Sequence, residues 1–235
     1  KGAIVVEPIS GIHFNIKVID FASLYPSILK TRNLGYSTIN CPHPECHSNT
    51  VPETTHWICT KNKAMEAEII GLLRDLRVFH YKKLKKINEW YSVVEQAIKV
   101  ILNASYGVFG DESFDLYCPP VSESITAIGR HSIISTINKA KEIGVTVLYG
   151  DTDSIFLKNP TDEQIKTLIE WSTKTLDLDL EVDKEYRYVC LSSRKKNYLG
   201  VGPDGKVDIK GMTGKKKHVP LIITASFDEV IKYLG

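Results

Sequence analysis

The stretch Tyr149–Ser154 reads Tyr-Gly-Asp-Thr-Asp-Ser and lies between two short apolar runs, residues 145–148 and 155–157. This pattern predicts a strand, a turn and a second strand, with Gly150 supplying the permissive backbone of the turn. Two carboxylates two residues apart at such a tip either repel each other or share a cation, and hard oxygen ligands suit Mg²⁺. A solvated hairpin tip is the alternative, because Asp is common in turns. The hexapeptide alone leaves both interpretations open.

The composition is that of an ordinary globular protein. Its 235 residues are 43% hydrophobic and 25% charged, which leaves room for one large or two small domains. A net charge of +2 gives no global basic signature, but lysines cluster at residues 82–86 and 195–196, where they could contact phosphates. With no membrane-length apolar run and no signal-peptide pattern, we expect an intracellular protein without a membrane partner. Because no Met precedes the strand-like start at Lys1, we expect a piece of a longer chain.

Residues 12–19 alternate between apolar and polar side chains, which predicts a half-buried strand with Ile12, Phe14, Ile16 and Val18 on its inner face. The next stretch, Asp20–Ile28, reads Asp-Phe-Ala-Ser-Leu-Tyr-Pro-Ser-Ile. Its proline suits the first turn of a helix, so we expect a tight strand-to-helix junction. Backbone N–H groups at such a junction form a natural phosphate site, beside which the Asp at the strand's end would lie.

Residues 40–62 are predicted to form an irregular insertion that contains Cys41, Cys46 and Cys59 and three histidines. This ligand count could hold Zn²⁺, although the spacing matches no standard zinc module. A disulfide is a second interpretation, suited to an intracellular protein of a hyperthermophile. Free thiols are the third, and the sequence does not decide among them.

Residues 63–107 predict two long helices that fold back on each other near Asn88. We expect apolar stripes on both helices, at Ile69, Leu72, Leu73, Leu76 and Phe79 and at Val93, Val94, Ile98, Ile101 and Leu102. Gly107 and Gly110 are expected to end the second helix.

Polar side chains at helical spacing also share a face on each of these helices, namely Lys99, Asn103 and Tyr106 on the second and Arg74, Arg77 and Tyr81 on the first. Two facing helices that carry Arg and Lys predict a clamp for a polyphosphate. For Lys99 alone, the simpler interpretation is a side chain that extends to solvent.

The rest of the chain predicts a body of sheet and helices. Residues 122–142 form a helix that packs on the sheet through Ile125, Ile128, Ile134 and Ile137. Thr161 and Gln164 predict a capping box, and Ser226 with Glu229 predicts the start of a last short helix. Residues 178–191 alternate as strands interrupted at 183–185, and residues 194–211 predict a hairpin turning at 202–205.

Three segments in this order resemble motifs A, B and C of the family B DNA polymerases. They are Asp20–Ile28, then Lys99–Gly107 with its Lys, three residues, Asn and Tyr-Gly, and finally Tyr149–Ser154. The three motifs in this order are very specific, and the resemblance covers essentially the whole chain. The Cys-rich insertion and the context of Arg77 are most similar to the replicative B-type enzymes of crenarchaea, which are archaea.

The resemblance implies an α+β fold: a polymerase palm with an antiparallel sheet backed by helices, plus an inserted helical-hairpin fingers subdomain. Residues 1–40 would form the first part of the palm, 41–107 the fingers, and 108–235 the second part of the palm up to the start of the thumb. The family's exonuclease domain and full thumb are not expected within this stretch. Since thumb contacts supply much of the affinity for duplex, we expect this stretch alone to bind DNA weakly and extend primers poorly, if at all.

The resemblance implies a DNA-directed DNA polymerase, a nucleotidyltransferase that adds deoxynucleotides to a primer 3′-hydroxyl and releases pyrophosphate in DNA replication. Asp20, Asp153 and the backbone carbonyl of Phe21 would bind two Mg²⁺ ions, with Asp151 close by. In such sites the two ions, about 3.5–4 Å apart, stabilise the attacking and leaving oxygens. Asp183 and Glu185 are either further carboxylates near the metals or a solvated hairpin edge.

The resemblance also assigns the substrate contacts. The nucleotide-binding residues would be Ser23, Leu24, Tyr25, Arg77, Lys99, Asn103, Tyr106 and Gly107. Tyr25 would exclude a ribose 2′-hydroxyl by its bulk. The DNA-binding residues would be Thr152, Lys195, Lys196, Tyr198, Lys210 and Gly211. One departure is Tyr81, since the family usually has a Lys four residues after the fingers Arg, so the phosphate grip is expected to be rearranged.

The implied partners are primer–template DNA, deoxynucleoside triphosphates and a sliding clamp or accessory subunits bound through other regions. The location would be cytoplasmic and nucleoid-associated in an archaeon, or nuclear in a eukaryote. One alternative function is an Asp-x-Asp metal-dependent glycosyltransferase, which gives no reason for Asp20 or for the face of Lys99, Asn103 and Tyr106. Another is a non-catalytic DNA-binding scaffold, which a replaced metal carboxylate would favour, whereas all three aspartates are present.

Overall fold

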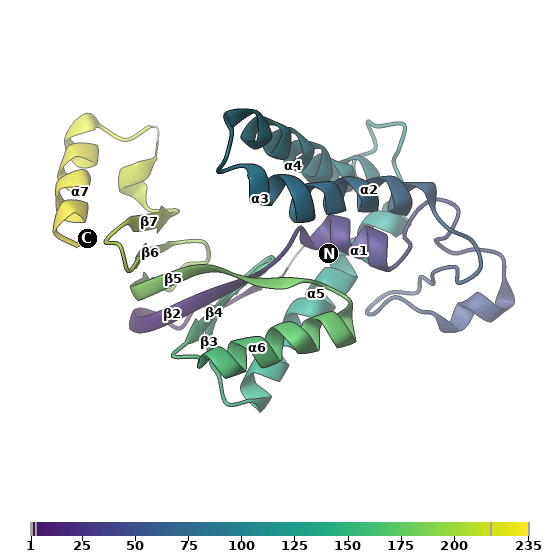
Figure 1. Ribbon diagram of the computed structural model, residues 1–235, viewed down its shortest axis with the longest axis horizontal. Helices are drawn as coiled ribbons and strands as arrows, with labels where there is room; N and C mark the ends of the chain where they lie inside the picture. Colours follow the sequence, from purple (N-terminus) through teal and green to yellow (C-terminus); the bar gives the residue numbers. More distant parts are fainter. Residues whose placement is uncertain (1, 3, 217, 235) are drawn as a thin grey trace. The chain divides into compact units, whose positions relative to one another are not determined.

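The computed structural model describes residues 2, 4–216 and 218–234 (Figure 1). The chain divides into two compact units. The helical unit comprises residues 1–3, Ala22–Ser132 and Leu176–Asp179, and the sheet unit comprises Ile4–Phe21, Ile133–Thr175 and Leu180–Gly235. The palm and fingers boundaries after residues 40 and 107 name functional subdomains and stay predictions.

The sheet unit holds a sheet of seven strands within the described residues, and all of its neighbouring strands are antiparallel. The strands are β1 (Val5–Val6), β2 (Gly11–Phe21), β3 (Thr146–Asp151), β4 (Ser154–Lys158), β5 (Leu180–Leu191), β6 (Tyr198–Val201) and β7 (Val207–Lys210). Their order is β1-β3-β4-β2-β5-β6-β7, so the motif C hairpin lies beside the strand that leads into motif A. Antiparallel sheet with helices confirms the predicted α+β class.

The alternation in β2 is only partly a burial pattern. Ile16 and Val18 are buried in the core of the sheet unit, but Ile12 and Phe14 are 63% and 60% exposed. The prediction of one buried face from residue 12 onward was therefore wrong, because the first half of the strand has no core on that face. A register shift between Val18 and Ile19 also interrupts the ladder with β5 just before Asp20.

Two further predictions about the sheet unit need correction. β5 continues as one strand through residues 183–185, since β2 pairs with Lys184 and Glu185 there, and only Asp183 is left out of the register. The last helix, α7 (Leu221–Leu234), begins before Ser226, which therefore lies inside the helix and does not cap it. The capping box of Thr161 and Gln164 at α6 (Asp162–Trp171) is confirmed, and so is the β6–β7 hairpin.

The helical unit contains the predicted helical hairpin, α2 and α3 against α4, which lie side by side in Figure 1. Its elements are α1 (Leu24–Thr31), the 3₁₀ turn η1 (Pro44–Ser48), α2 (Met65–Asp75), the π-helical η2 (Leu76–Tyr81), α3 (Lys82–Leu84) and α4 (Glu89–Gly110). The side chain of Asn88 caps α4, which confirms the turn. Helix α5 (Pro119–Glu142) starts in this unit and ends in the sheet unit. The π-helical η3 (Ser172–Leu176) and the 3₁₀ turn η4 (Thr213–Lys215) start in the sheet unit.

The predicted apolar stripes of the hairpin are only partly buried. Ile69, Leu72 and Phe79 are 50%, 63% and 53% exposed, whereas Ile98 and Leu102 are buried. Periodicity gives the helices correctly but does not say which apolar face has a partner. Within the described residues, no helix is long and apolar enough to cross a membrane.

Candidate active site and metal centre

The hairpin that carries Asp151 and Asp153 is formed by β3 and β4. The backbone N–H of Asp153 donates to the Asp151 carbonyl at 2.6 Å, and Thr152 occupies the turn with φ of 58°. The prediction that Gly150 supplies the turn backbone was therefore wrong. Gly150 lies in β3, where an added Cβ would come within 3.3 Å of the Val6 side chain. The absence of a side chain at Gly150 lets β1 pack close to β3, and the residue with positive φ in the turn is Thr152.

Asp20 reaches the tip of this hairpin because β2 lies beside β4. It stands opposite Ser154 in the ladder, and the next N–H, that of Phe21, donates to the Asp153 carbonyl at 3.0 Å. The antiparallel register thus brings together aspartates that are 131 residues or more apart in the sequence. Phe21 itself is buried, with its backbone held at the same place.

The three aspartates line one cleft of about 340 Å³ in the sheet unit, together with Thr152, Asp183, Lys184, Lys196, Tyr198 and Lys210. Burial raises the pKa of Asp153 above its ordinary value, and the charges of Asp151 and Asp183 add to the rise. Half-buried carboxylates that repel one another are suited to share a hard divalent cation. Glu185, the other acid considered beside Asp183, instead lies 3.5 Å from the Lys17 ammonium.

Lys196 supplies a positive charge at the edge of the cleft. Its Nζ lies 3.2 Å from Asp151 Oδ1, and its backbone N–H donates to the Tyr149 hydroxyl at 2.8 Å. Tyr198, predicted to contact DNA, is 7% exposed and packs in the sheet core, while Lys195 and Lys210 are exposed. Of the predicted DNA contacts, the three lysines are therefore exposed, whereas the Tyr198 side chain is buried.

Gly211 holds the backbone of Lys196 in place. With φ of +67°, a Cβ at this position would lie 2.1 Å from the Lys196 carbonyl oxygen. We expect Gly211→Ala to lower the free energy of unfolding by more than the ~1 kcal/mol that positive φ alone costs, because backbone must also shift.

Guanidinium titration measures this loss. Gly144→Ala is the matched control, since Gly144 has φ of +79° but no atom closer than 4.0 Å to the added Cβ. Equal losses in the two variants would show that the approach to Lys196 is unimportant.

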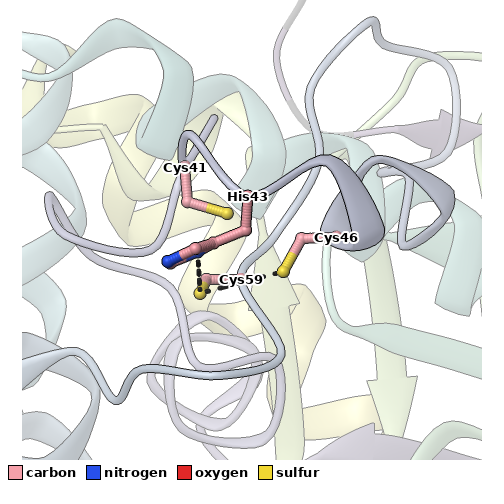
Figure 2. Close-up of side chains that lie close together, drawn as sticks. All are labelled: Cys41, His43, Cys46 and Cys59. Carbon is pink, nitrogen blue, oxygen red and sulfur yellow. Dashed lines mark hydrogen bonds between the residues drawn. The ribbon is translucent and has the colours of Figure 1, made fainter.

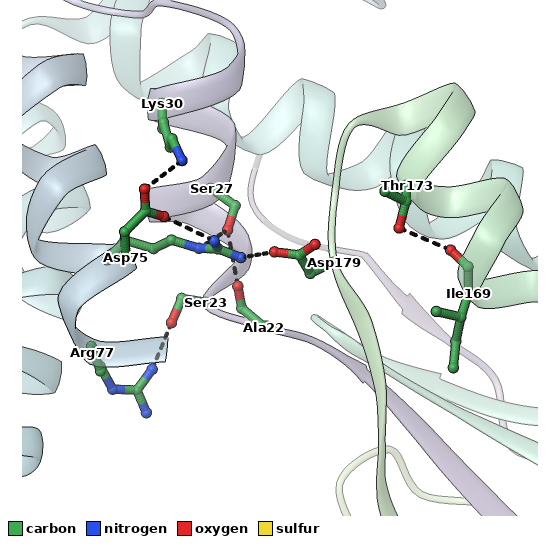
Figure 3. A network of polar contacts seen from close by, with 10 residues as sticks. Ala22, Ser23, Ser27, Lys30, Asp75, Arg77, Ile169, Thr173 and Asp179 are labelled. Atoms are coloured by element: carbon green, nitrogen blue, oxygen red, sulfur yellow. Dashed lines mark hydrogen bonds and ion pairs between the residues drawn. The ribbon is translucent and has the colours of Figure 1, made fainter. Parts of the chain in front are cut away.

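In the helical unit, Ser23 and Arg77 form the centre of a second polar group. Ser23 is the N-cap of α1 in the left-handed region, with φ of 56°, and its Oγ accepts from Arg77 Nη1 at 2.6 Å (Figure 3). Arg77 also donates to Glu95 Oε1 at 2.8 Å. Glu95 is buried on α4 four residues before Lys99, and sequence reasoning missed it although a buried acid requires a partner.

The residues of motif B lie on α4. Lys99, Asn103 and Gly107 are exposed, and Gly107 has no atom within 4 Å of an added Cβ. Tyr106 packs against Tyr25 of α1, with ring centroids 4.7 Å apart. Gly107 lies inside α4, which continues to Gly110, so of the two glycines only Gly110 ends the helix.

Arg74 does not belong to the predicted phosphate clamp. It is 3% exposed, and it donates to Ser27 Oγ at 3.0 Å, to Asp75 at 3.1 Å and to Asp179. The Ser27 hydroxyl in turn donates to the Ala22 carbonyl oxygen at 2.9 Å (Figure 3). Arg74 therefore fixes α1 to α2, and nothing in its sequence spacing separates it from Arg77.

The chain matches the profile of DNA polymerase family B over residues 1–234. It belongs to DNA polymerase family B. Among curated relatives of this family B chain, DNA polymerase 1 of Saccharolobus solfataricus is 51% identical over 98% of the chain, and DNA polymerase 1 of Aeropyrum pernix is 45% identical over all of it. The chain spans only 27% and 25% of those two relatives.

Solved structures agree. The family B DNA polymerase of the hyperthermophilic archaeon Pyrobaculum calidifontis superposes with a TM-score of 0.73 at 29% identity. That match covers 99% of this family B chain and 33% of the other. The resemblance of the three motifs is thus confirmed at the level of family and fold, including the similarity to crenarchaeal enzymes.

The insertion of this family B chain contains a separate cluster of four side chains that could bind a metal ion (Figure 2). Ligand atoms of Cys41, His43, Cys46 and Cys59 all lie within 4.8 Å of one another, the one such group among the described residues. The three cysteines are buried free thiols, so of the three interpretations left open by the sequence the disulfide is not the one observed. Of the three nearby histidines, His47 packs on Trp57 and His56 contacts Glu123. Only the structure selects His43.

Proposed function

We propose that the chain is the catalytic core of a DNA-directed DNA polymerase, which transfers deoxynucleotides to a primer 3′-hydroxyl under direction of a template and releases pyrophosphate. The observation that carries this proposal is the single cleft lined by Asp20, Asp151 and Asp153. Family membership and the names of the relatives support it. They favour a polymerase over the glycosyltransferase, which only the Asp-x-Asp pattern supports.

The proposed cofactor is a pair of Mg²⁺ ions held by Asp20, Asp153 and the Phe21 carbonyl, with Asp151 beside them. The donor set fits, because all of these groups offer hard oxygen ligands, and burial together with the charges of Asp151 and Asp183 raises the pKa of Asp153. Such a pair of ions stabilises the attacking and leaving oxygens of an in-line displacement. Lys196 offsets the charge of Asp151, which leaves Asp20 and Asp153 as the proposed ligands.

The triphosphate is proposed to bind at the start of α1. Backbone N–H groups of Ser23 and Leu24 begin this helix, whose N-terminus carries partial positive charge. The guanidinium of Arg77, held by Glu95 against Ser23, adds a fixed cation beside them. Lys99 and Asn103 are exposed on α4 and would supply further phosphate contacts. Because Tyr81 stands in place of the family's lysine, Arg77 and Lys99 would make a larger share of the contacts to the triphosphate.

Tyr25 is proposed to exclude ribonucleotides, with Tyr106 and Gly107 contacting the nascent base pair. The ring of Tyr25 is fixed between Tyr106 and Gly129, whose added Cβ would lie 3.2 Å from it. We expect Tyr25→Ala to raise ribonucleotide incorporation at least about tenfold, because a steric clash worth ~1.4 kcal/mol gives that factor. Ratios of kcat/KM for matched ribo- and deoxynucleotides measure it.

Tyr25→Phe is the matched variant for this test, since it keeps the bulk of the ring. We expect its sugar selectivity to match the wild type. Unchanged selectivity in Tyr25→Ala would remove Tyr25 from this role.

The proposed DNA contacts are Thr152, Lys195, Lys196, Tyr198, Lys210 and Gly211. Exposed ammonium groups neutralise phosphates and make affinity depend on salt, whereas Tyr198 and Gly211 would act by holding the lysine-bearing backbone. A sliding clamp or accessory subunits remain predicted partners. A cytoplasmic, nucleoid-associated location also remains a prediction.

Primer extension by the natural-length protein tests the proposal. Primed template, deoxynucleotides and Mg²⁺ should give template-directed extension that EDTA abolishes and added Mg²⁺ restores. A protein that binds primed DNA but never extends it would contradict the proposal and point to a DNA-binding scaffold. Extension unaffected by chelation would contradict the role of the three aspartates.

A further inference from the structure

The insertion between α1 and α2 brings three cysteines and one histidine to a single point (Figure 2). Cys46 Sγ lies 4.0 Å from Cys59 Sγ, and Cys59 Sγ lies 3.4 Å from His43 Nδ1. Tetrahedral zinc, with Zn–S of about 2.3 Å and Zn–N of about 2.0 Å, separates two sulfurs by about 3.8 Å and a sulfur from a nitrogen by about 3.5 Å. The spacing of the side chains is therefore that of four ligands around one ion.

We propose that Cys41, His43, Cys46 and Cys59 bind one Zn²⁺ ion in a structural site, independent of the proposed catalysis. Thiolate and imidazole donors select zinc over magnesium, which prefers oxygen. Four protein ligands complete the coordination sphere and leave no position for water or substrate, as in structural sites. All three cysteines are at most 3% exposed, so the ion would be shielded from solvent.

Backbone amides around the sulfurs support this assignment. Thr60 N–H donates to Cys46 Sγ at 3.4 Å, while Lys61 N–H and Asn62 N–H donate to Cys59 Sγ at 3.4 and 3.3 Å. A sulfur that accepts two amide hydrogen bonds is in the environment of a metal-bound thiolate, whose charge such donors stabilise. A buried neutral thiol has no comparable need for them.

The insertion has little regular secondary structure. Apart from turn and loop hydrogen bonds and the short η1, its strand pairing consists of the isolated bridges Ile39 with Ile58 and Thr50 with Trp57. The three cysteines are themselves the centre of its apolar cluster, with Trp57 packed against them. A segment with so small a core gains its folding free energy from a metal more readily than from burial.

The site also has a mechanical consequence within the helical unit. Asn33, just after α1, donates to the carbonyls of Cys59 and Asn62 at 3.4 and 2.7 Å and accepts from Ala64 N–H at 2.9 Å. Ala64 is the N-cap of α2. An ion at the four ligands would thus fix where α2 starts relative to the end of α1, and α2 leads into the segment that carries Arg77.

The test is metal analysis of the natural-length protein after dialysis against EDTA. We expect about one zinc per chain, and near zero in Cys46→Ser and Cys59→Ser. Cys190→Ser is the matched control, since Cys190 lies in β5 far from the group in the sequence and should keep the metal. His43→Gln should lose zinc, whereas His47→Gln, which alters a histidine outside the group, should keep it.

A second measurement covers variants that fail to fold. Wild-type protein reconstituted with Co²⁺ should show the intense visible absorption of a tetrahedral cobalt–thiolate centre, and Zn²⁺ should displace it. Wild-type protein without zinc that takes up no cobalt would overturn the proposal. So would a disulfide found between two of the three cysteines by peptide mapping without reductant, since the thiolates would then be consumed.

Discussion

Asp153→Ala is expected to reduce the rate of nucleotide addition by at least about 10³-fold, a loss of ~4 kcal/mol of transition-state stabilisation at 1.36 kcal/mol per tenfold. The side chain lies half-buried in the cleft it shares with Asp20 and Asp151, and its removal would take away one of the proposed Mg²⁺ ligands. Asp20→Ala should have an effect of the same order. Single-turnover extension of a primed template by natural-length protein measures both.

The fold should survive these two changes. The strand ends that carry the aspartates are held by backbone contacts, such as Phe21 N–H to the Asp153 carbonyl, which alanine keeps. Removing a repelling carboxylate from a half-buried cleft should if anything stabilise it. Asp115→Ala, on the exposed loop after α4, is the matched control and should extend at the wild-type rate. Near-normal extension by Asp153→Ala would exclude the carboxylate from catalysis.

Arg74→Ala is expected to destabilise the packing of α1 on α2 by about 3 kcal/mol, at the lower end of the range for breaking a buried ion pair. The guanidinium is buried, and its loss leaves Ser27 Oγ and Asp179 without their donor. The estimate stays at the lower end because the Asp179 side chain is 44% exposed and can be rehydrated. Native-state hydrogen exchange of amides in α1 and α2 measures the local opening free energy.

Lys30→Ala is the matched variant for this test. Lys30 also joins α1 to Asp75, at 2.7 Å, but its side chain is 40% exposed, so its loss should cost at most about 1 kcal/mol. A loss for Arg74→Ala as small as that for Lys30→Ala would show that the network is not what holds the two helices together.

Local sequence determined the parts of this protein that depend on neighbouring residues. The motif C hairpin, the helical hairpin with its Asn88 cap and the Thr161 capping box follow from periodicity and from side chains that bond their own backbone. The order of the three motifs also identified the family, because motif order can be read from the sequence without any structure.

Burial and partner choice were settled only by tertiary structure. Arg74 and Arg77 have the same helical spacing toward the predicted clamp, yet one is buried on Asp179 and the other lies against Ser23. Ile12 and Ile16 share one face of β2, yet one is exposed and the other buried. Three histidines accompany the cysteines, yet only His43 joins them. Spacing fixes which side chains point the same way, whereas contacts between segments distant in sequence decide what each of them meets.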